Sequence, residues 1–141
     1  MQFDEAFVST HFYRSLRKMP SSLRDIDDVE FDGDGADKYK AKYVLVEIVG
    51  QGGDTKAVAR AKRSAEFHRD IFEPFKAYLE KQGVAAKAKG GGRVEVNHIA
   101  KTLLIYGYSV DFGKAEHSDT ASLVRNSFGQ DWKIECSDDG Y

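Results

Sequence analysis

His68 could carry acid–base chemistry, and it lies near the start of a predicted helix in the segment Ser64–Asp70. Its helical phase differs from that of the apolar residues Phe67, Ile71 and Phe75, so it is not expected on the core-facing stripe. An imidazole that titrates near neutrality beside the free backbone N–H groups of a helix start is suited to handling a phosphoryl group. An exposed helical histidine is the simpler alternative, and the residues alone do not exclude it.

Two glycine-containing motifs lie on segments that are predicted to be neighbouring strands, Gly90-Gly91-Gly92-Arg93 and Tyr106-Gly107-Tyr108-Ser109. Glycine lets another group approach the backbone closely, and arginine offers a planar fork for phosphate oxygens. With the serine hydroxyl, these residue types indicate a phosphate-binding site. A bulge, a loop and a surface arginine would explain the same residues, and this alternative stays open at the level of the motifs.

Other motifs that suggest a ligand fail at a required position. Asp28–Tyr39 begins like a calcium-binding loop, but its twelfth residue is tyrosine where a bidentate glutamate is needed. Gly50–Lys56 follows a strand as phosphate loops do, but it lacks the Gly-Lys-Ser/Thr ending, which disfavours a nucleotide-dependent enzyme. The four histidines show no metal-binding spacing, and the lone Cys136 excludes an internal disulfide and a cysteine-based zinc site. No metal ion is therefore expected.

The composition restricts the class of protein. The 141 residues fit one domain, and 41% apolar with 31% charged side chains is a globular balance. The net charge of −2 argues against a nucleic-acid binder that relies on overall positive charge, although it permits a local patch. No apolar run approaches the length of a membrane span, and no signal-peptide pattern is present, so a cytoplasmic location away from membranes is expected.

Alternating strands and helices are predicted after an N-terminal extension, residues 1–24, whose role the sequence does not indicate. Apolar and β-branched runs predict strands at Asp28–Asp32, Tyr43–Val49, Val94–Val96, Thr102–Val110 and Asp131–Cys136.

Two helices are expected between these strands. The first carries apolar positions from Phe67 to Leu79, and Pro74 should kink it or make its first half irregular. The second should run from a cap at Ser118 or Asp119 to Asn126, with Gly129 just beyond its end. The order ββαββαβ predicts a single α/β domain, residues 25–141, with a mixed β-sheet flanked by helices.

Seven short motifs follow one another along this predicted domain. They are KYVLVEI at Lys42–Ile48, AEFHRDIF at Ala65–Phe72, KQG at Lys81–Gly83, GGGR at Gly90–Arg93, YGYS at Tyr106–Ser109, FG-x-A-x-H at Phe112–His117 and DDGY at Asp138–Tyr141. In order and spacing the set resembles the small phosphohistidine phosphatases, the Janus/Ocnus family. That family's fold is a mixed sheet flanked by helices, in agreement with the element order above.

The resemblance implies an enzyme that hydrolyses the P–N bond of phosphohistidine, and to some extent phospholysine, in proteins without a metal ion or cofactor. It implies that His68 draws a proton from the attacking water; a nucleophilic role for His68 is the less favoured alternative. Lys42 matches a substrate-binding lysine. Ser109, Val110 and Asp111 match the loop that binds phosphate through its backbone and the serine hydroxyl.

Two arginines and one departure complete what the resemblance implies. Arg93 matches the arginine of GGGR, and Arg60 occupies the place of a second arginine, eight residues before the histidine. Asp111 stands where the animal enzyme has a small neutral residue, and its carboxylate would repel phosphate if it pointed inward. The expected protein is a monomeric, cytoplasmic protein-histidine phosphatase that acts on phosphohistidine-containing proteins. A non-catalytic phosphate-recognition module on the same fold remains the alternative.

Overall fold

The sheet in the computed structural model, which describes residues 23–138, has six strands in the order β1-β3-β2-β4-β5-β6. Along the chain the elements are η1 (Leu23–Asp25), β1 (Val29–Asp32), β2 (Lys38–Val49), β3 (Thr55–Lys62), α2 (Arg69–Glu80), β4 (Ala85–Asn97), β5 (Thr102–Tyr106), α3 (His117–Phe128) and β6 (Lys133–Cys136). The predicted single α/β domain with a mixed sheet flanked by helices is confirmed.

The centre of the sheet is antiparallel and its edges are parallel. Strand β2 pairs antiparallel with β3 on one side and with β4 on the other, and β4 pairs antiparallel with β5. The edge strands β1 and β6 run parallel to β3 and β5. In this register Lys42 of β2 lies opposite Arg93 of β4, which lies opposite Tyr106 of β5. The three residues form one row across the sheet.

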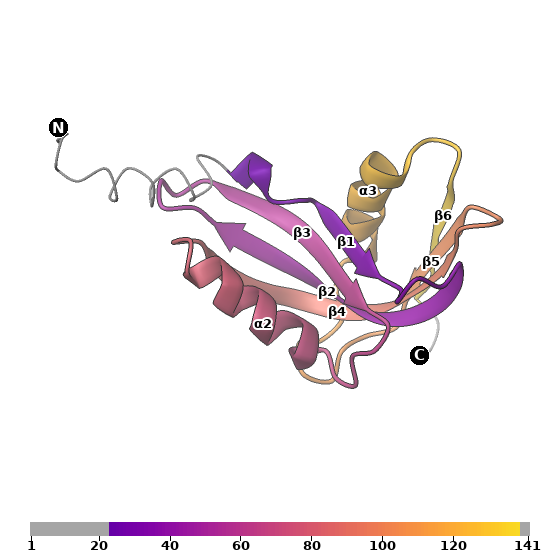
Figure 1. Cartoon of the computed structure of the whole chain (residues 1–141), viewed down its shortest axis with the longest axis horizontal. Coiled ribbons are helices and arrows are strands. Elements are labelled where there is room, and N and C mark those ends of the chain that lie inside the picture. The colour runs from indigo at the N-terminus through magenta and orange to yellow at the C-terminus, as the bar shows by residue number, and fades with distance from the viewer. Residues whose placement is uncertain (1–22, 139–141) are drawn as a thin grey trace, which may run out of the picture.

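The two helices cover opposite faces of the sheet, as Figure 1 shows. Because side chains alternate along a strand, Val44, Val46 and Ile48 of β2 join the core that contains α2 residues. Tyr43 and Leu45 join the core beneath α3. This double coverage explains the continuous apolar run from Tyr43 to Val49 that predicted the strand.

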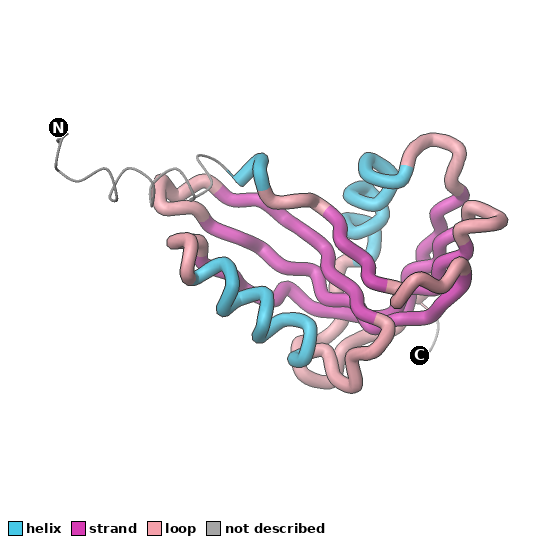
Figure 2. Tube along the Cα trace, viewed as in Figure 1, coloured by secondary structure: helices cyan, strands magenta, loops and turns pink. Residues whose placement is uncertain are grey.

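Helix α2 covers only part of its face, because it packs on β2, β3 and β4 but not on the edge formed by β5 and β6. In β5, Leu103 and Ile105 are buried beneath α3, whereas Thr102, Leu104 and Tyr106 on the opposite face are only half-buried. Figure 2 shows this end of the sheet extending beyond α2. One sheet face therefore stays open beside the helix.

The prediction missed strand β3. The loop at Gly50 was expected to lead directly to a helix, but it closes a hairpin in which the Gly50 N–H donates to the Asp54 carbonyl at 2.9 Å. The strand TKAVARAK carries three alanines and three basic residues, which have low β propensity. Its position between β1 and β2 outweighs that local preference, so the order is βββαββαβ.

Element boundaries also differ from the expected ones. Helix α3 begins at His117 after the N-cap Glu116, not after Ser118 or Asp119, and it ends at Phe128, two residues beyond the expected Asn126. Gly129 follows with φ of 109°, in the position expected for it. Helix α2 continues through Pro74 to Glu80.

The observed lengths of several strands also differ from the expected lengths, most of all in β4, which contains the glycine run. Strand β4 extends over Ala85–Asn97 and includes Gly90, Gly91 and Gly92, whereas only Val94–Val96 was expected. Strand β5 ends at Tyr106 rather than at Val110, and β6 begins at Lys133 rather than at Asp131.

The proposed extension, residues 1–24, lies almost wholly outside the described residues, as do Asp139–Tyr141 of the DDGY motif. Leu23, near the end of that extension, is buried in the core on the α2 side together with Ile26. Within residues 23–138, no helix is long and apolar enough to cross a bilayer.

Candidate active site

His68 is the N-cap residue of α2, and strand β4 buries it to 3% exposure. Its Nε2 donates a hydrogen bond to the carbonyl oxygen of Gly92 at 2.8 Å. Because a carbonyl oxygen can only accept, Nε2 carries the proton of the neutral ring, and the lone pair is on Nδ1. Among the described residues, Nδ1 has no hydrogen-bond partner. The ring is thus fixed in the tautomer that leaves one nitrogen available as a base.

The pKa of His68 lies below its usual value of 6.5. Burial is the largest cause, and the positive charges of Lys42 and Arg93 lower the pKa further. The hydrogen bond to Gly92 and the carboxylate of Asp111 raise it without reversing the direction. The imidazole is therefore neutral at physiological pH and can accept a proton.

Gly91 makes room for this histidine. A Cβ at this position would lie 2.6 Å from the Tyr43 carbonyl oxygen, 2.9 Å from Cδ2 of His68 and 3.1 Å from Cβ of Ser109. Real Cβ atoms do not approach backbone oxygens so closely, so any side chain here would displace His68 or Ser109. The close approach predicted from the glycine run is confirmed, and it joins the histidine to the loop that follows β5.

A cleft of about 260 Å³ opens beside His68, and its other lining residues are Lys42, Phe67, Arg69, Val110 and Asp111. The structure thus brings Lys42, Val110 and Asp111 to the histidine, as the family resemblance implied. Lys42 is half-buried and forms no ion pair with any residue between 23 and 138. A cation without an internal counter-charge beside a neutral imidazole favours an anionic ligand.

The loop that begins at Ser109 contributes Val110 and Asp111 to the lining of this cleft. Ser109 and Gly113 exchange N–H···O bonds of 3.1 and 2.8 Å, and the Ser109 Oγ accepts from the N–H of Phe112 at 3.0 Å. Gly113, with φ of 81°, also accepts from Gly91 N–H at 2.9 Å, which fixes the loop to β4. The N–H groups of Val110 and Asp111 have no acceptor in the described part of the chain. Two successive N–H groups without an internal acceptor remain available as donors to an anion.

The carboxylate of Asp111 faces Arg69 at the entrance of the cleft, with Oδ1 at 3.6 Å from Nη1. The Arg69 guanidinium also lies over the Phe67 ring, 4.5 Å from its centroid. Arg69 was not singled out from the sequence. Phe67 was expected on the core-facing stripe, which is wrong, because it precedes the helix and is 41% exposed. The Asp111 side chain is therefore held by a cation, and it still adds negative charge near the space that a phosphoryl group would occupy.

The two predicted arginines have different places. Arg93 lies beside Lys42 in the β2–β4 ladder and close enough to His68 to lower its pKa. Arg60 is not brought to the cleft: it is buried, its guanidinium lies 4.4 Å from the Phe75 ring centroid, and it donates to the carbonyl oxygens of Ala59 and Asp27, each at 2.9 Å. The assignment of Arg60 to phosphate is not supported, because its donors hold β3 to the segment before β1.

His117 was missed as a structural support of the site. Its Nε2 donates to the Gly107 carbonyl at 2.9 Å, and its Nδ1 accepts from the Tyr43 hydroxyl at 2.6 Å. Thr120 Oγ1 in turn donates to the Tyr43 hydroxyl at 3.1 Å. Burial raises the pKa of Tyr43, so the hydroxyl stays protonated and can donate. This network fixes Gly107, two residues before Ser109. His117 is the last residue of the FG-x-A-x-H motif, and that motif could have indicated its structural role.

The described residues hold no group of three His, Cys, Asp or Glu side chains that could bind a metal ion. What the cleft does hold is a neutral imidazole with a free nitrogen, an ammonium group and two backbone N–H donors. This set can bind an oxyanion and accept a proton from a water molecule placed next to it.

Three comparisons relate the chain to known proteins. Residues 23–131 match the family model described as the Janus/Ocnus family (Ocnus). The chain is 41% identical over 100 residues to the sex-regulated protein janus-A of Drosophila simulans, which covers 71% of this chain and 73% of that protein. It is 31% identical over 127 residues to the 14 kDa phosphohistidine phosphatase of Sus scrofa, covering 86% of this chain and 97% of that protein.

Proposed function

Because this chain belongs to the Janus/Ocnus family, we propose that it is a protein phosphatase that hydrolyses the P–N bond of phosphohistidine. A relative with 31% identity bears the name phosphohistidine phosphatase, whereas the janus-A relatives carry no activity in their names. We include phospholysine as a second substrate. We further propose that the protein is a cytoplasmic monomer that needs no metal ion or cofactor.

One observation carries the proposal. His68 lines the cleft as a neutral imidazole whose Nδ1 is unpartnered, and Lys42 stands next to it without an ion pair among residues 23–138. A site that only bound phosphate would gain from a charged, hydrogen-bonding histidine. Burial instead keeps this ring uncharged, which suits a general base.

In the proposed reaction, Lys42 and the N–H groups of Val110 and Asp111 bind the phosphoryl oxygens. Nδ1 of His68 takes a proton from water while the water oxygen forms a bond to phosphorus. The P–N bond breaks, and its electron pair remains on the substrate nitrogen, which takes a proton from the His68 imidazolium. Inorganic phosphate and the unmodified side chain leave. A positioned base contributes about 10²–10⁴-fold, and oriented donors stabilise the charge that develops on the oxygens.

The surroundings of the cleft favour a protein substrate. Among the large apolar side chains exposed in the described residues, three border the cleft or its loop: Phe67, Tyr108 and Val110, the last of which is 87% exposed. Exposed apolar side chains around a polar site are typical of surfaces that contact another protein. A buried pocket would be expected for a free metabolite, and this cleft is open.

The second candidate is a non-catalytic module that binds phosphorylated proteins. The carboxylate of Asp111 favours it, because a negative charge at the cleft entrance opposes the dianionic phosphoryl group. The two functions differ in whether phosphate is released.

We would incubate the protein with a phosphohistidine peptide and EDTA in ¹⁸O-labelled water, and follow phosphate by ³¹P NMR.

Release of phosphate that carries one ¹⁸O per turnover supports the phosphatase. Binding of the peptide without release supports the module. Trapping of phosphorus on His68 during turnover would assign His68 as the nucleophile and contradict its role as a base.

A further inference from the structure

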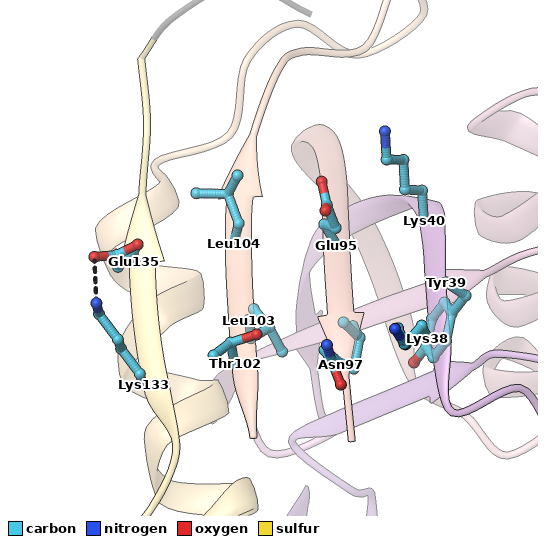
Figure 3. Close-up of a pocket in the computed structure, with 11 residues that line it drawn as sticks. Lys38, Tyr39, Lys40, Glu95, Asn97, Thr102, Leu103, Leu104, Lys133 and Glu135 are labelled. Atoms are coloured by element: carbon cyan, nitrogen blue, oxygen red, sulfur yellow. Dashed lines mark ion pairs between the residues drawn. The ribbon is translucent and has the colours of Figure 1, made fainter. Parts of the chain in front are cut away.

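The sheet face beside α2 remains open next to the candidate active site, and it forms a shallow hollow of about 480 Å³ (Figure 3). We call it the open face and define it by the residues Lys38, Lys40, Glu95, Leu104, Lys133 and Glu135. They come from four adjacent strands, β2, β4, β5 and β6, and their side chains share the face of the sheet on which α2 lies farther along. Nothing in the described part of the chain packs over them.

The open face is continuous with the cleft through the register of the strands. Lys42 and Arg93, which act on His68, occupy one row across β2 and β4. The next row on the same face places Lys40 opposite Glu95, which lies opposite Leu104. Two residues along a strand span about 6.6 Å. If the modified side chain of an extended peptide reaches His68, the peptide residues one or two positions away from it would therefore lie over this row.

The charge of this surface differs from that of the whole chain. Five cations lie on this surface: Lys42 at the cleft, Arg93 opposite it on β4, and Lys38, Lys40 and Lys133 on the open face. The open face also holds the carboxylates of Glu95 and Glu135. The local balance is positive although the chain carries −2. On the open face, Lys133 forms an ion pair with Glu135 at 3.6 Å, whereas Lys38 and Lys40 form no ion pair within residues 23–138.

We infer that the open face binds an acidic, extended segment of the substrate protein that flanks the phosphorylated residue. This inference rests on the proposed function. Lys38 and Lys40 would attract the carboxylates of the segment, and the half-buried Leu104 offers an apolar contact at the centre of the hollow. The cleft would recognise the phosphoryl group, and the open face would select among proteins that carry it.

The experiment compares three substrates: free phosphohistidine, and two phosphohistidine decapeptides with either Asp and Glu or Ser and Gly around the modified residue. The test variant is Lys38→Gln/Lys40→Gln. The control, Lys87→Gln/Lys89→Gln, removes two exposed lysines of β4 from the opposite face; Lys87 lies opposite Glu47 as Lys40 lies opposite Glu95. The wild type should show a lower KM for the acidic peptide than for the neutral one.

The test variant should raise the KM of the acidic peptide about three- to tenfold, since each exposed charge pair contributes modestly. Its kcat, and its KM for free phosphohistidine, should not change, and the control should resemble the wild type. Equal KM values for the two peptides in the wild type, or equal losses in the test variant and the control, would overturn the inference while leaving the phosphatase proposal intact.

A second measurement does not depend on catalysis. The acidic peptide with an unmodified histidine is titrated into the wild type while backbone amide NMR shifts are followed. Shifts at Lys40, Glu95 and Leu104 support docking even if no substrate is hydrolysed, in which case the phosphatase proposal alone fails. Shifts confined to the α3 face overturn the inference. Stronger shifts of the open face with a single-stranded oligonucleotide at equal charge would overturn an acidic polypeptide as the occupant.

Discussion

His68 and His117 lie on opposite sides of the glycine run in β4, and both contact Gly92. His68 Nε2 donates to the Gly92 carbonyl at 2.8 Å, and a Cβ on Gly92 would lie 2.7 Å from Cε1 of His117. One histidine belongs to the cleft, and the other holds Gly107 before the loop that begins at Ser109. The three glycines thus let two rings pack against one strand, which couples the proposed base to the loop.

Gly92→Ala should unfold the protein at lower denaturant concentration. The added Cβ would lie 2.4 Å from the Tyr106 carbonyl oxygen, which is backbone and cannot move aside. A loss of about 2–4 kcal/mol in the free energy of unfolding is expected from such overpacking, and urea titration measures it. Gly52→Ala is the control, because its Cβ would meet nothing closer than 3.7 Å. Equal stability of the two variants would contradict the close packing at Gly92.

The pH dependence of kcat/KM should show that His68 acts in its neutral form. Because burial lowers the pKa of His68 below 6.5, the activity should rise through an apparent pKa under 6.5 and level off at neutral pH. Lys42→Gln removes a nearby positive charge, so the ascending limb should move to higher pH. A limb that moves to lower pH in Lys42→Gln would contradict this arrangement of charges.

The same pKa predicts how stability depends on pH. The unfolded chain binds a proton at His68 at higher pH than the native chain does, so the contribution of His68 to stability falls as the pH drops through 6.5. In His68→Asn this part of the acid destabilisation should disappear, and urea midpoints measured between pH 7.5 and 5 would detect the difference. Parallel pH profiles for the variant and the wild type would show that the pKa of His68 is not lowered.

Asp111→Asn should tighten the binding of inorganic phosphate. The substitution removes the carboxylate that lines the cleft. It also releases Arg69, whose guanidinium lies 3.6 Å from that carboxylate in the native protein. A gain of about 1 kcal/mol is expected for a partly screened charge, and it should shrink as salt is added. Phosphate titration followed by NMR measures it. Asp131→Asn, which breaks the exposed ion pair with Lys101 far from the cleft, is the control. If phosphate binds Asp111→Asn and the wild type with equal affinity, the native Asp111 carboxylate does not repel the bound phosphate.

His117→Ala should lower both stability and activity. Its removal leaves the Gly107 carbonyl without its donor and the Tyr43 hydroxyl without its acceptor in a buried place. Such losses cost about 1–3 kcal/mol each. Urea unfolding and phosphohistidine turnover should both respond, whereas His98→Ala, at an exposed hairpin, should keep its turnover. Normal turnover in a folded His117→Ala would show that the network does not support the loop.

The sequence predicted parts of the site for different reasons. The phase of His68 was expected to differ from that of the apolar stripe, and this expectation is wrong: Phe67, which set the phase, precedes the helix and is 41% exposed. His68 is buried, and it lies three and four residues before the buried Ile71 and Phe72. The glycine run predicted close approach, which Gly91 and Gly92 both show. Lys42, Val110 and Asp111 could be assigned only through the family resemblance, because a lysine on a strand and a loop backbone carry no pattern of their own.

Arg60 shows why the rest could not be predicted. Its assignment came from its distance of eight residues from His68, but those residues include the end of β3, a strand whose alanine-rich sequence gave no signal. The strand turns the guanidinium toward Phe75 and the Asp27 carbonyl. The environment of Arg60 is set by residues from distant parts of the chain. Its role can therefore be assigned only once the strands that neighbour β3 are known.

The most direct test of the proposed function is the rate of phosphate release from a phosphohistidine peptide by the wild type and by His68→Ala, with EDTA present. The wild type should release phosphate catalytically, and His68→Ala should be slower by at least about 10²-fold, the effect of losing a positioned base. The variant must remain folded, which its urea transition will show. Near-normal turnover in a folded His68→Ala, or no turnover by the wild type, would contradict the account.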